Sequence, residues 1–550
     1  MKKKITLLVF LGAVVFSLSA CQLFSGDTGG GYSYRPIGSS NGGKMSDVST
    51  PPAGDLEAIA PGRTYKDYVD NNIYPISATP SIGKAKLLVI PVWFNDSSSF
   101  IQNDKKNNVI DDINTAYFGK NTDTGWRSVK TYYEEESHGN LKIDGTVSNW
   151  YEPNQSYQIY ARDDDHSKTI SLVQSAINWY FDIENPSEKR TDYDCDRDGY
   201  LDGVILIYAA PDYDCYGGNS NNNLWAFCYW IQEPSAKNTI RPGVNAFFWA
   251  SYDFMYGKNK ASTRTGSDRY SNGDTSNNVS VDAHTYIHEM GHMFGLEDYY
   301  DYSNSKYLPA GGFSMQDHNV GGHDPFSVFA LGWGKAYIPE TTMNIDLKPF
   351  TSSGEMIILS PKWNEYNSPF DEYLIIEYYT NDGLNYFDSN HPYMDGIKSY
   401  PTGSKDSGIR LWHVDARLAY TLDGNYSAAK ITTDPKISGQ KVKRLMSNSY
   451  NDGSLDMDYL SPLSERNPQN DRYSDFNLLE LVRNSTIVQT KSKSNMSSDN
   501  LFKAGDTFTM SRYTRQFINN AKLNNNTALG FNFTVNALNN GYASITVNKI

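Results

Sequence analysis

The stretch HTYIHEMGHMFGLEDYY, residues 284–300, contains three of the nine histidines of a 550-residue chain. His288 and His292 are four residues apart, so on a helix they lie on one face, roughly 5 to 6 Å apart, and both can reach one metal ion. Glu289 projects near the same face, where it can take a proton from a metal-bound water without being a ligand itself. The pattern therefore predicts a helix that carries a catalytic metal site.

The third ligand is predicted from the residues that follow His292. Gly295 can adopt the left-handed conformation, which ends the helix and lets the chain turn back toward the metal. Asp298 is the first suitably placed carboxylate after that turn, and two imidazoles with one carboxylate leave zinc a fourth position for water. His284 also lies four residues before His288, but no glutamate follows it, so we interpret it as a surface histidine or as a support for the metal ligands.

The composition limits the kind of protein that carries this site. With 39% hydrophobic and 20% charged residues, the chain is long enough for two or three domains with a sizeable core. Its 63 acidic and 49 basic residues give a net charge of −14, which argues against nucleic acid as a partner. The 41 tyrosines and only 4 cysteines suit an extracellular protein whose fold is not built on disulfides.

Residues 1–21 have the features of an export signal. Three lysines precede an apolar run from Ile5 to Ala20, and the sequence LSAC that ends at Cys21 resembles the lipobox of bacterial lipoproteins. Acylation of Cys21 would anchor the protein at the extracellular face of a bacterial membrane. The alternative is a secreted protein that is cleaved near Ala20. Residues 22–78 are rich in Gly, Ser, Pro and Asn, which predicts a flexible tether.

Two folded regions are predicted after the tether. In residues 79–340 strand-like runs and helical periodicities interleave, with buried strands expected at 85–94 and 202–211. The segment GNLKIDGTVSNWYE, residues 139–152, has the pattern of strands around an Asp-Gly turn. In residues 341–550 helical periodicity mostly disappears and short strand-like runs follow one another, which predicts a β-rich C-terminal domain.

A second ion site is predicted at DCDRDGYLD, residues 194–202. Clustered carboxylates repel one another without a cation, and a glycine permits the sharp turn of such a loop. Five residues match positions 1, 3, 5, 6 and 9 of a calcium loop, namely Asp194, Asp196, Asp198, Gly199 and Asp202. Position 12, normally a glutamate, is Ile205, so the loop is not a complete EF-hand, and a solvated acidic turn is the alternative.

The cysteines after Cys21 suggest one disulfide. Cys215 and Cys228 flank a short loop, and a bridge between them would contribute roughly 3 kcal/mol to stability. Cys195, inside the acidic loop, would then stay single.

Several segments resemble, in the same order, the immune inhibitor A-like family of secreted bacterial zinc metalloproteases. They cover most of residues 79–420 and are YYEEESHGNLKIDGTVSNWY (132–151), DCDRDGYLDGVILIYAAP (194–211), HEMGHMFGLEDYYD (288–301), DPFSVFALGW (324–333) and SGIRLWHVD (407–415). The resemblance implies an α+β fold, with a zincin-type, metzincin-like catalytic domain followed by the β-rich domain. It also implies zinc ligands at His288 and His292, a general base at Glu289 and a third ligand at Asp298. The acidic loop matches an Asp-Gly-rich segment of the family, which favours structural calcium.

The resemblance leaves alternatives for the third ligand. Family members usually read Leu-Pro-Asp where this chain has Leu296, Glu297 and Asp298, so Glu297 is an alternative, and Glu377 is a more distant one. Met315 lies 17 residues after Asp298, a spacing compatible with the methionine turn beneath the zinc site of metzincin-like proteases.

The hydrogen-bond donor for the oxyanion of a tetrahedral intermediate cannot be chosen from the sequence. The candidates near the motif are His318, His323, Tyr299 and Tyr300. His413 and Asp415 lie in an apolar strand, where a packing role is the alternative.

These features together predict a membrane-anchored extracellular zinc endopeptidase that hydrolyses peptide bonds in proteins through a zinc-activated water. The expected cofactors are catalytic zinc and structural calcium. The expected partners are protein or peptide substrates and, through Cys21, the membrane, with no nucleic acid. The alternative function is a surface adhesion lipoprotein with a vestigial zinc site.

Overall fold

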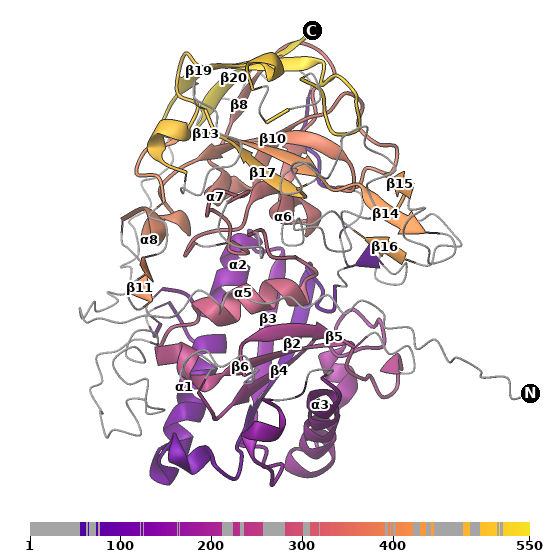
Figure 1. The fold of residues 1–550 in the computed structure, drawn as a ribbon, viewed down its shortest axis with the longest axis vertical. Helices are drawn as coiled ribbons and strands as arrows, with labels where there is room; N and C mark the ends of the chain where they lie inside the picture. Colours follow the sequence, from indigo (N-terminus) through magenta and orange to yellow (C-terminus); the bar gives the residue numbers. More distant parts are fainter. Residues whose placement is uncertain are drawn as a thin grey trace, which may run out of the picture.

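The computed structural model places helix α5 (His284–Met293) between a lower sheet and an upper set of strands (Figure 1). It describes residues 56–61, 64, 66, 73–74, 77–121, 123–124, 126–161, 163, 166–211, 224–231, 236–256, 281–300, 308–317, 319–390, 394–395, 398–399, 403–421, 430–435, 442–444, 477–484, 496–513, 516–517 and 521–550. Within these residues helices and strands are mixed, as predicted.

The lower sheet is mostly parallel, and its strands run in the order β3-β2-β4-β6-β5. Its members are β2 (Gly83–Val92), β3 (Leu141–Val147), β4 (Gly203–Tyr208), β5 (Phe227–Trp230) and β6 (Ala246–Ser251). Only β5, at the edge, pairs antiparallel. β4 and β6 are buried at every position, which explains their unbroken apolar runs. The predicted buried strands are confirmed here.

The helices of the first half are α1 (Lys106–Phe118), α2 (Val129–Glu136), α3 (Ser167–Trp179), α5 (His284–Met293) and α6 (Pro325–Ala330). Ser128 begins α2 because its hydroxyl accepts the Thr131 N–H, and Asp324 caps α6 by accepting from Ser327 N–H. One-turn 3₁₀ helices lie at Ser97–Ser99, Asn103–Lys105, Tyr157–Ile159, Arg190–Tyr193, Tyr252–Tyr256, Ser498–Asn500 and Met510–Arg512, and a π-helical turn at Tyr180–Glu184 follows α3.

The predicted Asp-Gly turn within residues 139–152 is wrong. β3 runs through Asp144 and Gly145 without a break and pairs parallel with β2. A Cβ on Gly145 would lie 2.3 Å from the carbonyl oxygen of Leu87 and 2.6 Å from the ring of Phe118. The glycine therefore serves close packing of the backbone and not a hairpin turn.

The second half is built mainly of strands. A five-stranded sheet has the order β17-β13-β10-β9-β7 and a four-stranded sheet the order β18-β19-β20-β8. Their strands are β7 (Lys335–Tyr337), β8 (Met343–Leu347), β9 (Glu355–Leu359), β10 (Glu372–Tyr379), β13 (Gly408–Asp415), β17 (Leu479–Val482), β18 (Thr507–Phe508), β19 (Phe531–Leu538) and β20 (Ala543–Lys549).

Smaller elements complete this half. The hairpin β11 (Met394–Asp395) and β12 (Lys398–Ser399) follows helix α8 (Asn385–Asn390), and α7 (Phe350–Ser353) precedes β9. A four-stranded sheet has the order β1-β16-β14-β15, with β1 (Ile73–Tyr74), β14 (Leu418–Thr421), β15 (Lys430–Thr432) and β16 (Val442–Arg444).

The central sheet of the second half joins two hydrophobic cores. Side chains of β10 alternate between its two faces: Tyr373 and Ile375 pack in the core shared with the lower half, whereas Leu374 and Ile376 pack in the core of the C-terminal strands. β7 belongs to this sheet although it precedes residue 340, so the sheet begins slightly before the predicted domain boundary. The two halves therefore share a core.

The described part of residues 22–78 is packed and is not the free tether that was predicted. Ile59 pairs with Ala336, β1 pairs with β16, and the N–H of Ala78 donates to the carbonyl oxygen of Met293 at 2.8 Å. Through this strand pairing and the contact with α5, the described residues of this segment are part of the folded structure. Cys21 and the predicted export signal lie outside the described residues. Among the described helices, none combines the length and the apolar character that crossing a bilayer requires.

Candidate active site

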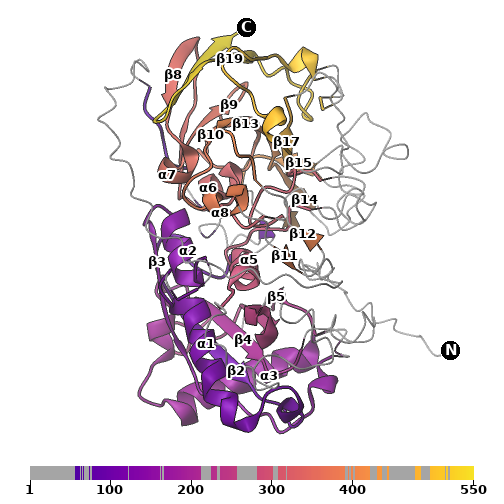
Figure 2. The same cartoon turned by 90° about the vertical axis from the view of Figure 1, so that its left-hand side faces the viewer.

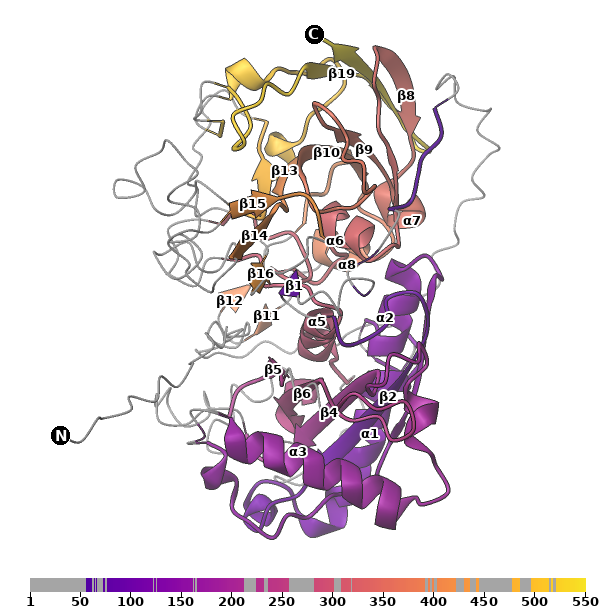
Figure 3. The same ribbon diagram turned by 90° about the vertical axis from the view of Figure 1, so that its right-hand side faces the viewer.

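Helix α5 lies at the contact between the two halves of the molecule, as Figures 2 and 3 show from opposite sides, and its sequence includes His288 and His292. The Nδ1 of His288 lies 2.7 Å from the carbonyl oxygen of Met315, and the Nδ1 of His292 lies 2.7 Å from that of Leu296. Because a carbonyl oxygen only accepts, both Nδ1 atoms carry the proton and donate. In its neutral form each ring then offers the Nε2 lone pair, as metal-bound histidines do.

Both Nε2 atoms face the carboxylate of Asp298. Its Oδ1 lies 3.0 Å from Nε2 of His288 and 3.4 Å from Nε2 of His292. All three side chains are buried, and one donor atom from each lies within 4.8 Å of the others. This set of two imidazoles and one carboxylate is the donor set that zinc prefers with an open fourth position.

The alternative third ligands lie outside this group. Glu297 is buried, but its carboxylate is not among the three donors. Glu377 in β10 accepts from the indole N–H of Trp412 at 3.1 Å and lies 3.6 Å from Arg410. Of the three candidate carboxylates, Asp298 is the one that faces both histidines.

The electrostatics of the group favour a cation between its members. Burial disfavours the charged form of His292, but the nearby carboxylate of Asp298 outweighs burial and raises the pKa of His292 to about 9. Burial also opposes the charge of Asp298, yet His292 and His288 hold the pKa of Asp298 well below its usual range. Without a metal, His292 therefore holds a proton beside the Asp298 carboxylate at neutral pH, and a bound metal ion would take the place of that proton.

The return of the chain to the site depends on Gly295. α5 ends at Met293, and Gly295 has a φ of +94°, with its N–H donating to the carbonyl oxygen of His292 at 3.0 Å. The N–H of Leu296 donates to Gly291 at 3.2 Å, so the last carbonyls of the helix are used. The predicted helix end at Gly295 is confirmed, and it explains how Asp298 comes back to the histidines.

Glu289 is fully buried next to the two histidines. Its negative charge helps to raise the pKa of His292 and also raises that of Tyr133. The carboxylate therefore lies close enough to influence the group electrostatically, although it is not one of the three clustered donors.

The remaining candidates near the motif are held by other groups. The Nε2 of His284 lies 2.9 Å from the carbonyl oxygen of Asn319, the hydroxyl of Tyr299 lies 2.8 Å from that of Ser327, and Tyr300 is buried. Met315 is buried and supplies the carbonyl that His288 uses. His318 lies outside the described residues.

His323 lies among aromatic rings. Its Nδ1 is 2.8 Å from the hydroxyl of Tyr132, and its ring contacts Tyr133 and Trp333. Burial, together with His288 and His292, lowers the pKa of His323 to about 3, so this ring is neutral.

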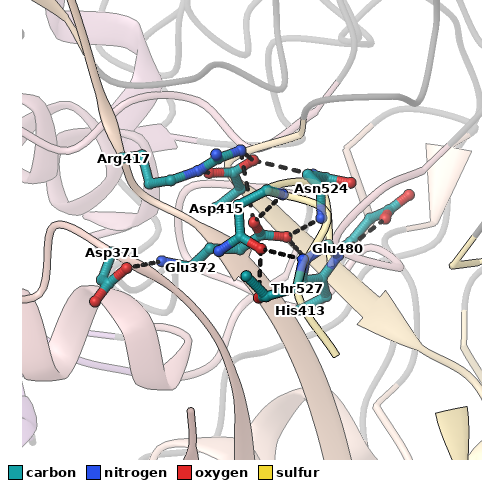
Figure 4. A network of polar contacts seen from close by, with 9 residues as sticks. Asp371, Glu372, His413, Asp415, Arg417, Glu480, Asn524 and Thr527 are labelled. Carbon is teal, nitrogen blue, oxygen red and sulfur yellow. Dashed lines mark hydrogen bonds and ion pairs between the residues drawn. The ribbon is translucent and has the colours of Figure 1, made fainter. Parts of the chain in front are cut away.

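His413 and Asp415 belong to a separate buried network in the second half, which Figure 4 shows from close by. His413 lies 3.0 Å from Glu372, and Asp415 forms a two-point ion pair with Arg417, with both distances at 2.7 Å. Both residues pair within this network, which supports a packing role.

The acidic loop brings Asp194, Asp196 and Asp202 within 4.8 Å of one another. Asp198 stands apart, because its carboxylate binds the Lys66 ammonium at 2.7 Å, and the same ammonium lies 3.3 Å from Asp196. Burial raises the pKa of Asp202 to about 7. A lysine thus supplies part of the positive charge that the loop needs.

The predicted disulfide is not described by the structure, because Cys215 lies outside the described residues. Cys228 in β5 is buried, with its Sγ 3.4 Å from the sulfur of Met293 in α5.

Several residues around the site were not foreseen. The Nε2 of Gln316 lies 3.4 Å from Nδ1 of His292, and a Cβ on Gly291 would lie 2.1 Å from Oε1 of Gln316. Glycine inside the motif therefore makes room for Gln316. Glu136, far away in the sequence, accepts the N–H of His323 at 2.6 Å. In the sequence, the glycine at position 291 is the one signal that could have indicated the close approach of Gln316 to the helix.

Comparison with known proteins agrees with this geometry. Residues 82–315, which include the motif and Met315, match the family model described as immune inhibitor A peptidase M6, catalytic domain. This match supports the predicted family over these residues. No curated protein sequence matches the chain. A peptidase M6 domain supports a metalloprotease that acts on proteins or peptides, and the grouping of His288, His292 and Asp298 supports a metal site in it.

Proposed function

We propose that this protein is a zinc-dependent endopeptidase. The observation that carries the proposal is the convergence of the Nε2 atoms of His288 and His292 on Oδ1 of Asp298, at 3.0 and 3.4 Å, in a buried site. Both rings are held by their Nδ1 protons on backbone carbonyls, so they need no rearrangement to bind an ion.

Zinc, when bound there, activates a water and polarises the carbonyl of the scissile bond. Glu289 accepts the proton of the attacking water and passes it to the leaving amine. Its burial among Tyr117, Tyr133 and Cys228, on whose pKa its charge acts, keeps bulk water away from that proton.

The substrate chain is proposed to bind along β5. Within the described part of the lower sheet this strand is one of the two edge strands, and α5 lies directly against it, with Cys228 of β5 in contact with Met293 of α5. An extended peptide can add to such an edge through backbone hydrogen bonds that do not depend on its sequence. This favours unfolded or flexible proteins as substrates.

The test compares Glu289→Gln with Glu297→Gln in the full chain. We expect Glu289→Gln to retain one zinc per chain and to lose casein hydrolysis on the order of 10²- to 10⁴-fold, because only proton transfer is removed. Glu297→Gln changes a neighbouring buried carboxylate outside the metal group and should keep both zinc and activity. Full activity in Glu289→Gln would refute the mechanism. A zinc-loaded wild type that hydrolyses nothing would favour the adhesion protein.

Structural calcium at the acidic loop is part of the proposal. The clustered oxygens of Asp194, Asp196 and Asp202 support it, and Lys66 is the competing cation. Adding calcium to the zinc-loaded protein should raise its Tm, and Asp194→Asn should abolish that rise. A wild-type Tm that stays constant during the titration contradicts calcium binding.

We also propose a location at the extracellular face of a bacterial membrane, with a lipid anchor at Cys21. This rests on the sequence pattern of residues 1–21 alone. A labelled fatty acid should enter the wild-type protein and not Cys21→Ser; an unlabelled wild type would leave secretion as the answer.

A further inference from the structure

The carbonyl group that orients His288 belongs to a segment that we call the support loop, residues 314–317 and 319–323. The N–H of Met315 donates to the carbonyl oxygen of Gly322 at 3.2 Å, so the two ends of the loop are tied together. Met315 then offers its own carbonyl to Nδ1 of His288 at 2.7 Å. Any shift of Gly322 is therefore passed through one residue to the imidazole of His288.

Helix α2 holds the end of the support loop near Gly322. The Oε1 of Glu136 accepts the His323 N–H at 2.6 Å, and a Cβ on Gly322 would lie 3.2 Å from Oε2 of the same carboxyl group. The hydroxyl of Tyr132 donates to the carbonyl oxygen of Gly321 at 3.1 Å. That hydroxyl has then used its proton, so Nδ1 of His323 must donate to it across 2.8 Å.

Helix α8 of the second half holds the same end from the other side. The side-chain oxygen of Asn385 accepts the Gly322 N–H at 3.3 Å. The carboxyl group of Asp388 accepts a backbone hydrogen bond from Val320. The support loop is thus fixed by elements from both halves of the molecule, and the 2.6 Å bond to Glu136 is shorter than those to Tyr132 and Asn385.

We propose that Glu136 is a positioning residue for the metal ligand His288. By fixing His323 and Gly322 it holds the carbonyl of Met315 where Nδ1 of His288 can donate to it, and this sets the direction of the Nε2 lone pair. The proposal rests on the metal centre of the proposed function. Partners that orient a metal-bound histidine typically change metal affinity or activity by 10- to 100-fold when they are removed.

The test uses cobalt in place of zinc, because the visible absorption of bound cobalt reports the geometry of its ligands. Glu136→Ala should bind cobalt roughly 10- to 100-fold more weakly than the wild type, with a shifted spectrum. Glu136→Gln keeps an acceptor oxygen and should restore both readings. Burial raises the pKa of Glu136 to about 8, so at neutral pH its carboxyl group is mostly protonated and glutamine resembles it closely.

Two further variants separate positioning from folding. Glu135→Ala removes the neighbouring carboxylate of the same helix, which pairs with Arg127 at 2.7 Å. It forms no hydrogen bond or ion pair with the described residues of the support loop, so the cobalt spectrum of this variant should match the wild type. Asn385→Ala removes a weaker bond to Gly322 and should give a smaller loss of affinity in the same direction. If Glu136→Ala does not fold, the cobalt affinity of Asn385→Ala provides the test instead.

The outcomes are distinct. A lower Tm in a folded Glu136→Ala variant, with unchanged cobalt affinity and spectrum, would show a structural role only and overturn the inference. Failure of Glu136→Gln to restore the spectrum would also count against it. If the wild type itself binds neither zinc nor cobalt, the proposed metal centre fails, and with it the basis of the inference.

Discussion

Among the described residues, two of the buried clusters of histidine and carboxylate groups differ in how their charges are matched. At the proposed metal centre two imidazoles face one carboxylate oxygen, that of Asp298, at 3.0 and 3.4 Å. In the network of Figure 4, Glu372 accepts from Asn524 and Asn525 backbone N–H groups and from His413. Asp415 forms a two-point ion pair with Arg417 and also accepts a hydrogen bond from the side-chain amide of Asn524.

The arrangement of hydrogen-bond donors and lone pairs distinguishes a candidate metal site from a structural network. In the network the donors come from several elements, and both Glu372 and Asp415 bind more than one of them, so the protein itself supplies the partners of these carboxylates. At the metal centre the Nδ1 protons point away, toward backbone carbonyls, and the Nε2 atoms converge on one oxygen. Convergence of lone pairs, more than burial or the presence of histidine, indicates an ion.

The strongest way to break this comparison is to remove one histidine from each cluster. His292→Ala should lower zinc affinity by several orders of magnitude and abolish casein hydrolysis, because it removes one of three ligands. His413→Gln should retain zinc and activity and lose only stability. Zinc content after dialysis, measured beside Tm, checks both. Loss of zinc in His413→Gln would show that the two clusters are coupled.

The next largest effect is expected from Arg417→Met. It leaves Asp415 and Glu372 buried without their guanidinium, and breaking a buried pair in this way costs about 3 to 5 kcal/mol. Urea unfolding of the zinc-loaded protein measures it. Arg241→Met, which breaks an exposed pair with Asp182, should change stability by about 1 kcal/mol or less. Equal losses of unfolding free energy in the two variants would mean that the buried network stabilises the fold no more than an exposed ion pair does.

Local geometry made much of the arrangement at the proposed metal centre predictable. The spacing of His288 and His292 fixes their common face on a helix, and Gly295 fixes where that helix can end, since both rules act within one or two turns. The long apolar runs of β2 and β4 were equally local signals. The choice of Asp298 over Glu297 needed the structure, because it depends on how the chain folds back after residue 295.

Contacts between distant segments could not be read in the same way. Glu136 and His323 are 187 residues apart, and nothing near either residue indicates that they meet. The Asp-Gly pair at 144 and 145 was misread because the same dipeptide suits a hairpin turn and a tightly packed strand. The composition of residues 22–78 predicts a tether that includes Lys66, because composition indicates only how readily a segment orders by itself. It does not reveal a distant partner, and here the acidic loop is the partner that binds Lys66.

The finest test asks whether Asp371 belongs to the matched network, and it has the smallest expected effect. Burial raises the pKa of Asp371 to about 6, although Arg417 acts in the opposite direction. Its ordinary pKa is about 3.9, so between about pH 4 and 6 the folded chain binds more protons than the unfolded chain. This residue therefore makes the free energy of unfolding fall as pH rises through that window.

Asp371→Asn keeps the shape of the side chain and removes the charge. Above pH 6 the variant should be more stable than the wild type by about 1 to 3 kcal/mol, and between pH 4 and 6 its stability should depend less on pH. Urea unfolding at pH 4.5 and 7.5 measures both. A variant less stable than the wild type at pH 7.5 would mean that Arg417 matches the Asp371 charge fully. The network would then extend to the start of β10, and its contrast with the metal centre would be complete.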